Sequence, residues 1–153
     1  MGSQVLLTGE LLYEAEIRFT GIVEYGVSMA ALSSGLTAPP PDGARFDQSF
    51  EGSLRGPRLR GRITGTDYLR VSADGRFRLH IHAQIQTNDG QDISFISEGV
   101  TYQGERSCEA ELRATVSLFS SSPQYKSLNP LQVWALGSLD LDHGRALVRA
   151  YIP

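Results

Sequence analysis

Hydrophobic and polar residues alternate along several long segments of the chain, most strictly in residues 76–87. The apolar positions of that segment are Phe77, Leu79, Ile81, Ala83 and Ile85. Because successive side chains of a β-strand point to opposite faces, this alternation predicts a long strand with one apolar face. Residues 88–90, Asn-Asp-Gly, tolerate positive φ, and a second apolar run follows at 93–100. We therefore predict a β-hairpin across residues 76–100.

Similar alternation occurs near both ends of the chain, in residues 10–25 and 106–119. The apolar face expected for the first of these segments carries Tyr13, Ala15, Ile17, Phe19 and Val23. Two further apolar runs, 131–141 and 145–152, flank an Asp-His-Gly turn and predict a C-terminal hairpin. Residues 27–34 have the composition of one or two helical turns.

Glycines punctuate short strands from residue 45 to residue 104, and helical periodicity is scarce throughout. Such spacing is typical of antiparallel barrels and sandwiches, in which glycines permit bulges and bends. Small residues on the expected inward faces predict a lumen that side chains do not fill; they are Ala83, Ala110, Ala114, Ala135, Ala146 and Ala150. We predict an all-β fold with little helix, a single antiparallel β-barrel of the lipocalin or calycin kind. It is expected to form one domain over residues 1–153.

The formal net charge of −3, without a dense cluster of Lys and Arg, argues against a nucleic-acid partner and against binding to an anionic membrane surface. No apolar run is long enough to span a bilayer, and the first residues lack the pattern of a signal peptide. We therefore expect a cytoplasmic protein that does not associate with membranes. Cys108 is the only cysteine, which excludes a disulfide framework, and its apolar neighbours predict a buried, unreactive thiol.

The polar face of residues 76–87 carries the most distinctive candidate for chemistry, His80 and His82. Two imidazoles on one strand face can ligate a transition metal together with a carboxylate from another strand. Alternatively, one imidazole serves as a general acid or base, or forms a hydrogen bond to a substrate. Arg78 and Gln84 share this face, so a surface exposed to solvent and without chemistry is the third interpretation. The sequence leaves all three open.

Asp67 and Tyr68 come shortly after a glycine and before another apolar strand. Asp67 is either a carboxylate of the site or a turn residue that bonds to its own backbone. The chain contains no phosphate-binding loop, nucleophile elbow or dinucleotide-binding fingerprint. We therefore expect no cofactor and no resident metal.

Several short motifs follow one another in a recognisable order between Gly43 and Asn129. They are Gly43-Ala-Arg45, Gly56-Pro-Arg-Leu-Arg-Gly61, Gly65-Thr-Asp67-Tyr68, Thr87-Asn-Asp89-Gly90, Gly99 and Tyr125-x-x-Leu128-Asn129. Their order and spacing resemble the DUF3237 (UPF0311) family over most of the chain. The resemblance implies a compact antiparallel barrel related in shape to lipocalins and allene oxide cyclases, and it implies no particular reaction. It also implies that Arg45 and Asn129 line or close the mouth of the barrel.

The chain departs from the pattern of that family at two places. The family typically has Asp-Trp where this chain has Asp67-Tyr68, so the carboxylate is kept and the aromatic ring is exchanged. The family usually has Asp-x-Arg where this chain has His80 and His82. A charged pair at those positions implies a polar strand face that looks into the barrel, which would bring the two imidazoles into the lumen.

We predict that the barrel encloses a small organic substrate, such as a secondary metabolite, and promotes a cofactor-free isomerisation, cyclisation, hydration or elimination. His80 or His82 would move the proton, and Asp67 would orient an imidazole or hold a second proton. Tyr68 and Arg45 would bind the substrate and stabilise an oxygen that gains charge.

A non-catalytic, lipocalin-like binding protein is the main alternative, because the same residues could anchor a ligand without chemistry. A metal-dependent enzyme is another, and it needs a further ligand beside His80 and His82. His143, in the last turn, is a poor candidate for that ligand. If the polar face of residues 76–87 lines the lumen, its apolar face must be covered from outside, which favours a homodimer.

Overall fold

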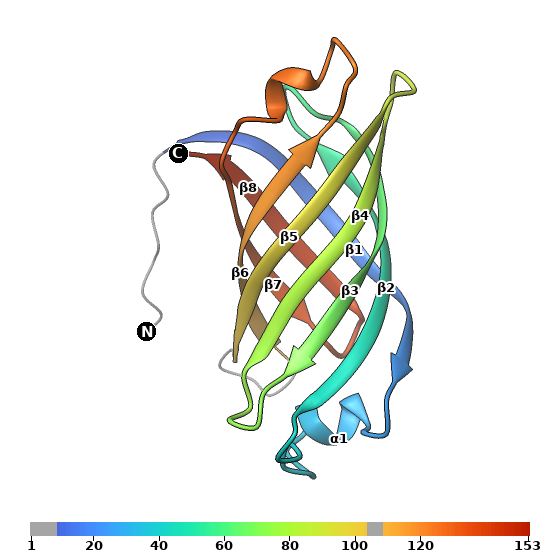
Figure 1. Cartoon of the computed structure of the whole chain (residues 1–153), viewed down its shortest axis with the longest axis vertical. Helices are drawn as coiled ribbons and strands as arrows, with labels where there is room; N and C mark the ends of the chain where they lie inside the picture. Colours follow the sequence, from blue (N-terminus) through green and yellow to red (C-terminus); the bar gives the residue numbers. More distant parts are fainter. Residues whose placement is uncertain (1–8, 104–108) are drawn as a thin grey trace.

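Eight antiparallel strands form one closed barrel (Figure 1), in a computed structural model that describes residues 9–103 and 109–153. Each strand pairs with the next one along the chain, and β8 pairs with β1 to complete the ring. The strands are β1 (Glu10–Glu24), β2 (Ala44–Arg55), β3 (Gly61–Val71), β4 (Phe77–Thr87), β5 (Asp92–Gln103), β6 (Glu109–Phe119), β7 (Val133–Asp140) and β8 (Arg145–Ile152). The prediction of a single antiparallel β-barrel is confirmed.

Two short helical segments lie at opposite ends of the barrel (Figure 1). The helix α1 (Met29–Ser33) begins after Ser28, whose hydroxyl oxygen accepts a hydrogen bond from the Ala31 N–H at 3.2 Å. A serine is favoured there because it satisfies an amide that has no partner within the helix. The 3-10 helix η1 (Lys126–Leu128) lies in the connection from β6 to β7. The helical turns expected at residues 27–34 are therefore confirmed, and they sit below one mouth of the barrel.

The predicted hairpin is formed by β4 and β5 around residues 88–90. Gly90 has a φ of +87°, a conformation that is nearly free of strain only in glycine. The Thr87 N–H donates to the carbonyl oxygen of Gln91 at 2.8 Å, and the Gly90 N–H donates to the carbonyl oxygen of Thr87 at 2.9 Å. These two bonds fix the register of the hairpin.

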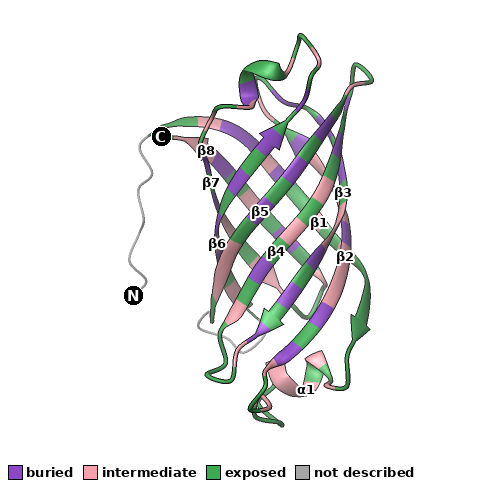
Figure 2. Ribbon diagram, in the orientation of Figure 1, coloured by how far each residue is buried: buried purple, intermediate pink, exposed green. Residues whose placement is uncertain are grey.

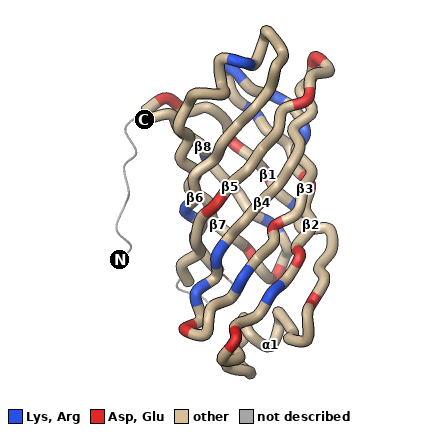
Figure 3. The backbone as a smooth tube through the Cα atoms, viewed as in Figure 1, with Lys and Arg blue, Asp and Glu red and all other residues tan. Residues whose placement is uncertain are grey.

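The apolar face of β4 points into the barrel and its polar face points outward. Leu79 and Ile85 are buried, whereas His80 and His82 are exposed. Buried and exposed residues alternate in this way along most strands (Figure 2). Arginines gather in the lower parts of β2, β3 and β4, where Figure 3 shows several blue segments close together, and Arg45, Arg70 and Arg78 on these strands are exposed. The inward orientation of the polar face of β4, which the family resemblance implied, is thus wrong.

The second half of β1 also differs from the expected pattern. The pairing of β1 with β2 shifts by one residue between Phe19 and Gly21, which is a β-bulge. One extra residue reverses the faces of every side chain that follows it. As a result, Ile22 lines the interior, and Val23, which we expected to share the inward face with Phe19, is 51% exposed.

Large apolar side chains fill one end of the barrel, the end that carries η1. They come from the ends of strands and from two connections, and include Leu12, Leu59, Ile85, Ile93, Leu118, Leu128 and Val133. None of them lines the interior cavity described below. The barrel therefore has one packed end and one hollow end, and the hollow end faces α1.

No helix within residues 9–103 and 109–153 is long and apolar enough to cross a membrane. Cys108, for which we predicted a buried thiol, lies outside the described residues. The apolar face of β4 is covered by the barrel interior, so this face does not need a partner subunit to cover it. The homodimer stays a prediction without that support.

Candidate functional site

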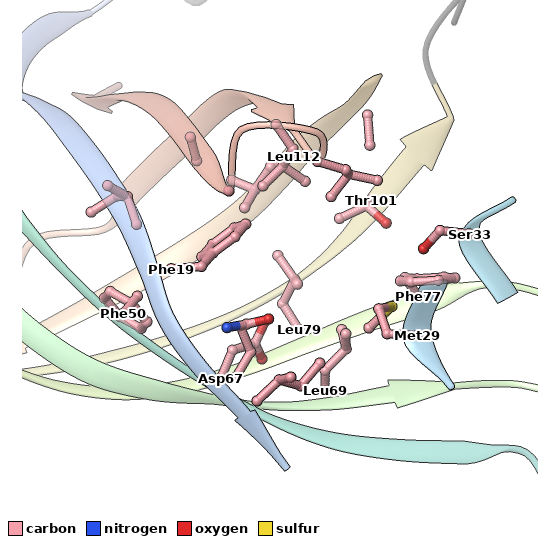
Figure 4. Close-up of a pocket in the computed structure, with 18 of the residues that line it drawn as sticks. Phe19, Met29, Ser33, Phe50, Asp67, Leu69, Phe77, Leu79, Thr101 and Leu112 are labelled. Carbon is pink, nitrogen blue, oxygen red and sulfur yellow. The ribbon is translucent and has the colours of Figure 1, made fainter. Parts of the chain in front are cut away.

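The hollow half of the barrel contains a cavity of about 1020 Å³. Its wall is mostly apolar, and its aromatic residues are Tyr13, Phe19, Phe50, Phe77 and Phe95. Met29 and Leu32 of α1 also line it, so the short helix forms part of the mouth (Figure 4). A cavity of this size can enclose most of a drug-sized ligand. The expectation of an unfilled lumen is confirmed. Of the small residues expected there, Ala110, Ala135 and Ala146 line the cavity, and Ala83, Ala114 and Ala150 do not.

Asp67 is the acidic residue placed deepest in this apolar wall. It lies on β3 between the inward residues Gly65 and Leu69, and its side chain is only 8% exposed. Figure 4 shows its carboxylate among Leu69 and Leu79, pointing into the same space as Phe19. Gln48, which also lines the cavity, is the register partner of Asp67 on β2.

The carboxylate of Asp67 interrupts the hydrogen-bond ladder between β3 and β4. Regular pairing runs up to Asp67 and Ile81 and resumes at Arg70 and Arg78. Within this interval the backbone N–H of His80 donates to Asp67 Oδ1 at 2.9 Å. A side-chain oxygen therefore takes the place of a backbone acceptor, which holds the carboxylate at the wall and satisfies a buried amide.

Burial raises the pKa of Asp67 from its ordinary value of 3.8 to about 6. The cause is the loss of water around the charged form, which an apolar wall cannot replace. The hydrogen bond from the His80 N–H and the nearby His80 ring act in the opposite direction and lower this pKa, but by less. Near neutral pH the group can therefore both accept and donate a proton at small cost, as an acid–base catalyst must.

His80 and His82 lie on the other side of the same wall, outside the barrel. The Nε2 atoms of the two rings are 3.1 Å apart, and His80 Nδ1 lies 3.2 Å from Glu98 Oε1. The Tyr68 and His82 rings are nearly perpendicular, with a centroid distance of 6.0 Å. Asp67 bonds to the backbone of His80 and not to its imidazole, so the expected contact between carboxylate and imidazole inside the lumen is not formed.

The three predicted substrate-binding residues are also placed away from the cavity. Arg45 and Tyr68 lie in a shallow depression of about 400 Å³ on the outer wall. Asn129 lies at the packed end, where its Oδ1 accepts from the Ser120 N–H at 2.8 Å and its Nδ2 donates to the Ser120 carbonyl at 2.9 Å. Asn129 therefore anchors the connection from β6 to β7 and does not line the hollow mouth.

The structure thus brings together four of the six predicted residues, Arg45, Tyr68, His80 and His82, but does so outside the barrel. Only Asp67 faces the lumen. In the described part of the chain, no group of three or more His, Cys, Asp and Glu side chains is arranged to hold a metal ion. The further ligand that a metal site at the two histidines requires is therefore missing from residues 9–103 and 109–153.

Residues 38–151 match the family described as a protein of unknown function, DUF3237. The chain belongs to the DUF3237 family. No curated protein matches it.

Solved structures similar to this DUF3237 chain share its fold at low sequence identity. A protein of unknown function from Clostridium acetobutylicum has a TM-score of 0.75 and 17% identity, over 94% of this chain and 96% of its own. A β-barrel-like protein from Acinetobacter baumannii has a TM-score of 0.72 and 19% identity, over 99% of both chains. A structure described as an enzyme from Penicillium herquei has a TM-score of 0.67 and 22% identity, over 100% of both chains.

Two lumen residues of this DUF3237 barrel escaped the sequence analysis, Gln48 and Ser97. Gln48 Nε2 donates to the carbonyl oxygen of Gly21 at 2.6 Å, and Ser97 Oγ donates to the carbonyl oxygen of Thr115 at 2.8 Å. Gln48 is a polar residue at an inward position between Phe46 and Phe50, and Ser97 follows the inward residues Ile93 and Phe95. That interruption of the pattern is the signal that could have identified them.

Proposed function

We propose that this barrel is an enzyme that binds a small, largely apolar organic molecule and rearranges it by proton transfer, with Asp67 as the acid–base group. The observation that carries this proposal is one buried carboxyl group, with a pKa of about 6, on the wall of an apolar cavity of about 1020 Å³. A carboxyl group tuned toward neutral pH inside a cleft is a common property of catalytic acids and bases.

The proposed chemistry is a cofactor-free isomerisation, cyclisation, hydration or elimination. Asp67, when ionised, takes a proton from the bound molecule and returns it, or another, to a second position. The apolar wall excludes water, which keeps the carboxylate reactive and holds a flexible substrate folded. The His80 N–H keeps one carboxylate oxygen fixed, so the other oxygen is directed to the substrate. His80 and His82 have no proton-transfer role in this version, because their rings are outside.

Polar contacts to the substrate are proposed for Gln48 and Ser97, which line the cavity on either side of Asp67. Gln48 is its register partner on β2, and Ser97 on β5 is the register partner of Ile81, which in turn pairs with Asp67. The three residues therefore lie in one row across neighbouring strands. Such a row could orient a molecule with two oxygen atoms, while the aromatic walls hold its carbon skeleton.

The experiment compares the wild type with Asp67→Asn, which keeps the shape and an acceptor oxygen but cannot take a proton. Binding is measured with the uncharged fluorophore N-phenyl-1-naphthylamine. Turnover is measured by mass spectrometry over a panel of apolar ketones, enols and phenols. Asp67→Asn should bind the fluorophore as the wild type does and lose turnover by about 100-fold or more. The wild-type rate should rise with pH around a midpoint near 6 if Asp67 is the base.

The matched control is Asp47→Asn, because Asp47 lies one register step from Asp67, on the outer face of the neighbouring strand. It should leave both binding and turnover unchanged. Turnover by Asp67→Asn within tenfold of the wild type, on a substrate that competes with the fluorophore, would refute the role of Asp67.

A ligand carrier without chemistry is the second candidate, and the predominance of apolar residues in the cavity wall favours it. A carrier should bind its ligand equally well as the wild type and as Asp67→Asn. Every compound of the panel should then be recovered chemically unchanged. The structural neighbour from Penicillium herquei, which shares the fold at 22% identity and is described as an enzyme, favours the catalytic proposal.

A further inference from the structure

Three arginines form a row on the outer wall, directly behind the cavity. Arg45 on β2 is the register partner of Arg70 on β3, and Arg70 is the register partner of Arg78 on β4. All three side chains are exposed. Like charges placed directly opposite one another on neighbouring strands repel and destabilise a sheet. A row of three neighbouring arginines therefore needs a physical explanation.

These arginines differ from most others in the described part of the chain, because none of them pairs with a carboxylate there. The arginines that do form ion pairs are Arg18, Arg55, Arg58, Arg76, Arg113, Arg145 and Arg149. Acidic residues close to the row have other partners. Asp74 Oδ2 lies 3.0 Å from Arg76 Nε. Asp47 Oδ2 accepts from the Tyr25 hydroxyl at 2.6 Å, and Glu98 Oε1 lies 3.2 Å from His80 Nδ1.

The row borders a concave surface and not a flat one. The outer depression, as we call it, has a volume of about 400 Å³ and is lined by Arg45, Tyr68, Arg70, Arg78, Leu79, His80 and Glu98. It lies over the interval in which β3 and β4 are not regularly paired. Guanidinium groups on three strands, a phenol and an imidazole therefore surround one space from several sides.

We propose that the outer depression binds an oxyanion of the phosphate type, such as a phosphate or diphosphate group of a small molecule. Guanidinium groups are planar, permanently charged and well suited to bidentate hydrogen bonds with phosphate oxygens. A tetrahedral anion can accept bonds from three directions at once, which matches a row that spans three strands. The bound anion would also remove the repulsion within the row. Tyr68 and His80 supply further polar groups at the rim.

This proposal is independent of the chemistry proposed for Asp67. The two sites lie on opposite faces of the same pair of strands and share only the lining residue Leu79. Loss of one site by substitution of an arginine need not alter the other, because the arginine side chains point away from the lumen.

The test titrates the full chain with pyrophosphate at constant ionic strength, because salt screens exposed charges. Binding is followed by calorimetry and by the backbone amide signals in NMR spectra. We expect saturable binding of one ion with a dissociation constant below about 1 mM, equivalent to about −4 kcal/mol. The shifted amides should belong to the middle and lower parts of β2, β3 and β4. The double variant Arg70→Gln/Arg78→Gln should weaken binding about tenfold or more.

The control Arg62→Gln is matched to the single variant Arg70→Gln, because each removes one positive charge from the outer face of β3 and Arg62 does not line the depression. It should leave the affinity within twofold of the wild type. Equal losses in Arg62→Gln and in Arg70→Gln, or shifts spread over the whole surface without saturation, would show nonspecific attraction and overturn the proposal. Citrate bound as tightly as pyrophosphate would overturn the assignment to phosphate. The NMR map of the wild type needs no variant, so a misfolded variant would not prevent a decision.

Discussion

The buried position of Asp67 destabilises its charged form, because water reaches the carboxylate poorly. Its pKa is higher in the folded chain than the ordinary value of 3.8, so the folded chain binds the proton more tightly than the unfolded chain does. Unfolding between these two pKa values therefore releases a proton. It follows that this contribution to stability is fully present below about pH 4 and is lost as the pH rises through about 6.

We predict that Asp67→Asn abolishes this loss of stability with rising pH. The free energy of unfolding of the wild type, relative to the variant, should fall by about 2 kcal/mol between pH 4 and pH 7.5, since one pKa unit corresponds to about 1.4 kcal/mol and the unfolded carboxyl group is already more than half ionised at pH 4. Urea denaturation of both proteins across this pH range measures the difference. Taking the difference between the two proteins cancels the contributions of the other carboxyl groups, because both proteins contain them.

Asp89 offers a control with the opposite sign. Hydrogen bonds from the hydroxyls of Thr87 and Tyr125 hold the pKa of Asp89 below its usual range. Its charged form therefore stabilises the folded chain above pH 4 and loses that effect as the pH falls. Asp89→Asn should be less stable than the wild type at pH 7, and the gap should close in acid. If Asp67→Asn behaved as Asp89→Asn does, the raised pKa of Asp67 would be wrong.

At the residue level, the sequence shows which side chains share a face but not which face is inside. His80 and His82 were correctly grouped with Arg78 on one side of β4, because alternation determines that grouping. Whether this face points into the barrel or outward depends on how β4 is placed in the closed ring. Alternation with a period of two residues does not determine that placement. Asp67 was singled out as a candidate carboxylate, but its position on the inner wall required the register with β2 and β4.

Among the strands, β5 shows how closely neighbouring backbones approach in this barrel. A Cβ atom added at Gly99 would lie 2.6 Å from Ala114 Cβ and would also meet the carbonyl oxygen of Arg113 on β6. Real Cβ atoms do not come that close to such groups. Glycine is therefore required at this position by space and not by an unusual φ.

We predict that Gly99→Ala destabilises the protein by about 1–3 kcal/mol, because β5 and β6 would have to move apart. Thermal and urea unfolding measure the loss. Gly21→Ala is the matched control, since a Cβ at Gly21 has no atom within 4 Å and its φ is not in the positive range. It should change stability by no more than about 0.5 kcal/mol. A tolerated Gly99→Ala would mean that the two strands can separate easily.

Strand positions were predictable and the bulge was not. The observed β1, β4 and β6 begin and end within a few residues of the expected segments, because each has a strict apolar alternation. The bulge after Phe19 leaves no trace in the pattern, since Ile22 and Val23 are both apolar and either could face inward. Only the pairing with β2 decides between them.

The whole molecule combines a packed end with a hollow end, and this division should determine where apolar ligands bind. Ala146 lines the cavity, whereas the next residue on β8, Leu147, points outward and is 60% exposed. A phenylalanine at Ala146 would occupy space that a ligand needs, while a phenylalanine at Leu147 would point into solvent.

We predict that Ala146→Phe lowers the affinity for N-phenyl-1-naphthylamine about tenfold or more, and that Leu147→Phe leaves it unchanged. Fluorescence titration measures both affinities, and the unfolding temperature confirms that each variant is folded. Equal affinity in the two variants would mean that the fluorophore binds outside the cavity. The small residues in the sequence anticipated a hollow barrel, but its volume and its position beside α1 depend on how the strands are staggered.

The pairing of β8 with β1 has a consequence for aggregation. In a closed ring, each of the eight described strands has a partner on both sides, so none of them is a free edge along its whole length. The ring joins the two ends of the sequence at a seam whose register shifts between Leu11 and Tyr13. Opening that seam would create two free edges at once, one on β1 and one on β8. The step that completes the barrel is therefore also the step that protects the chain against strand-to-strand assembly with its copies.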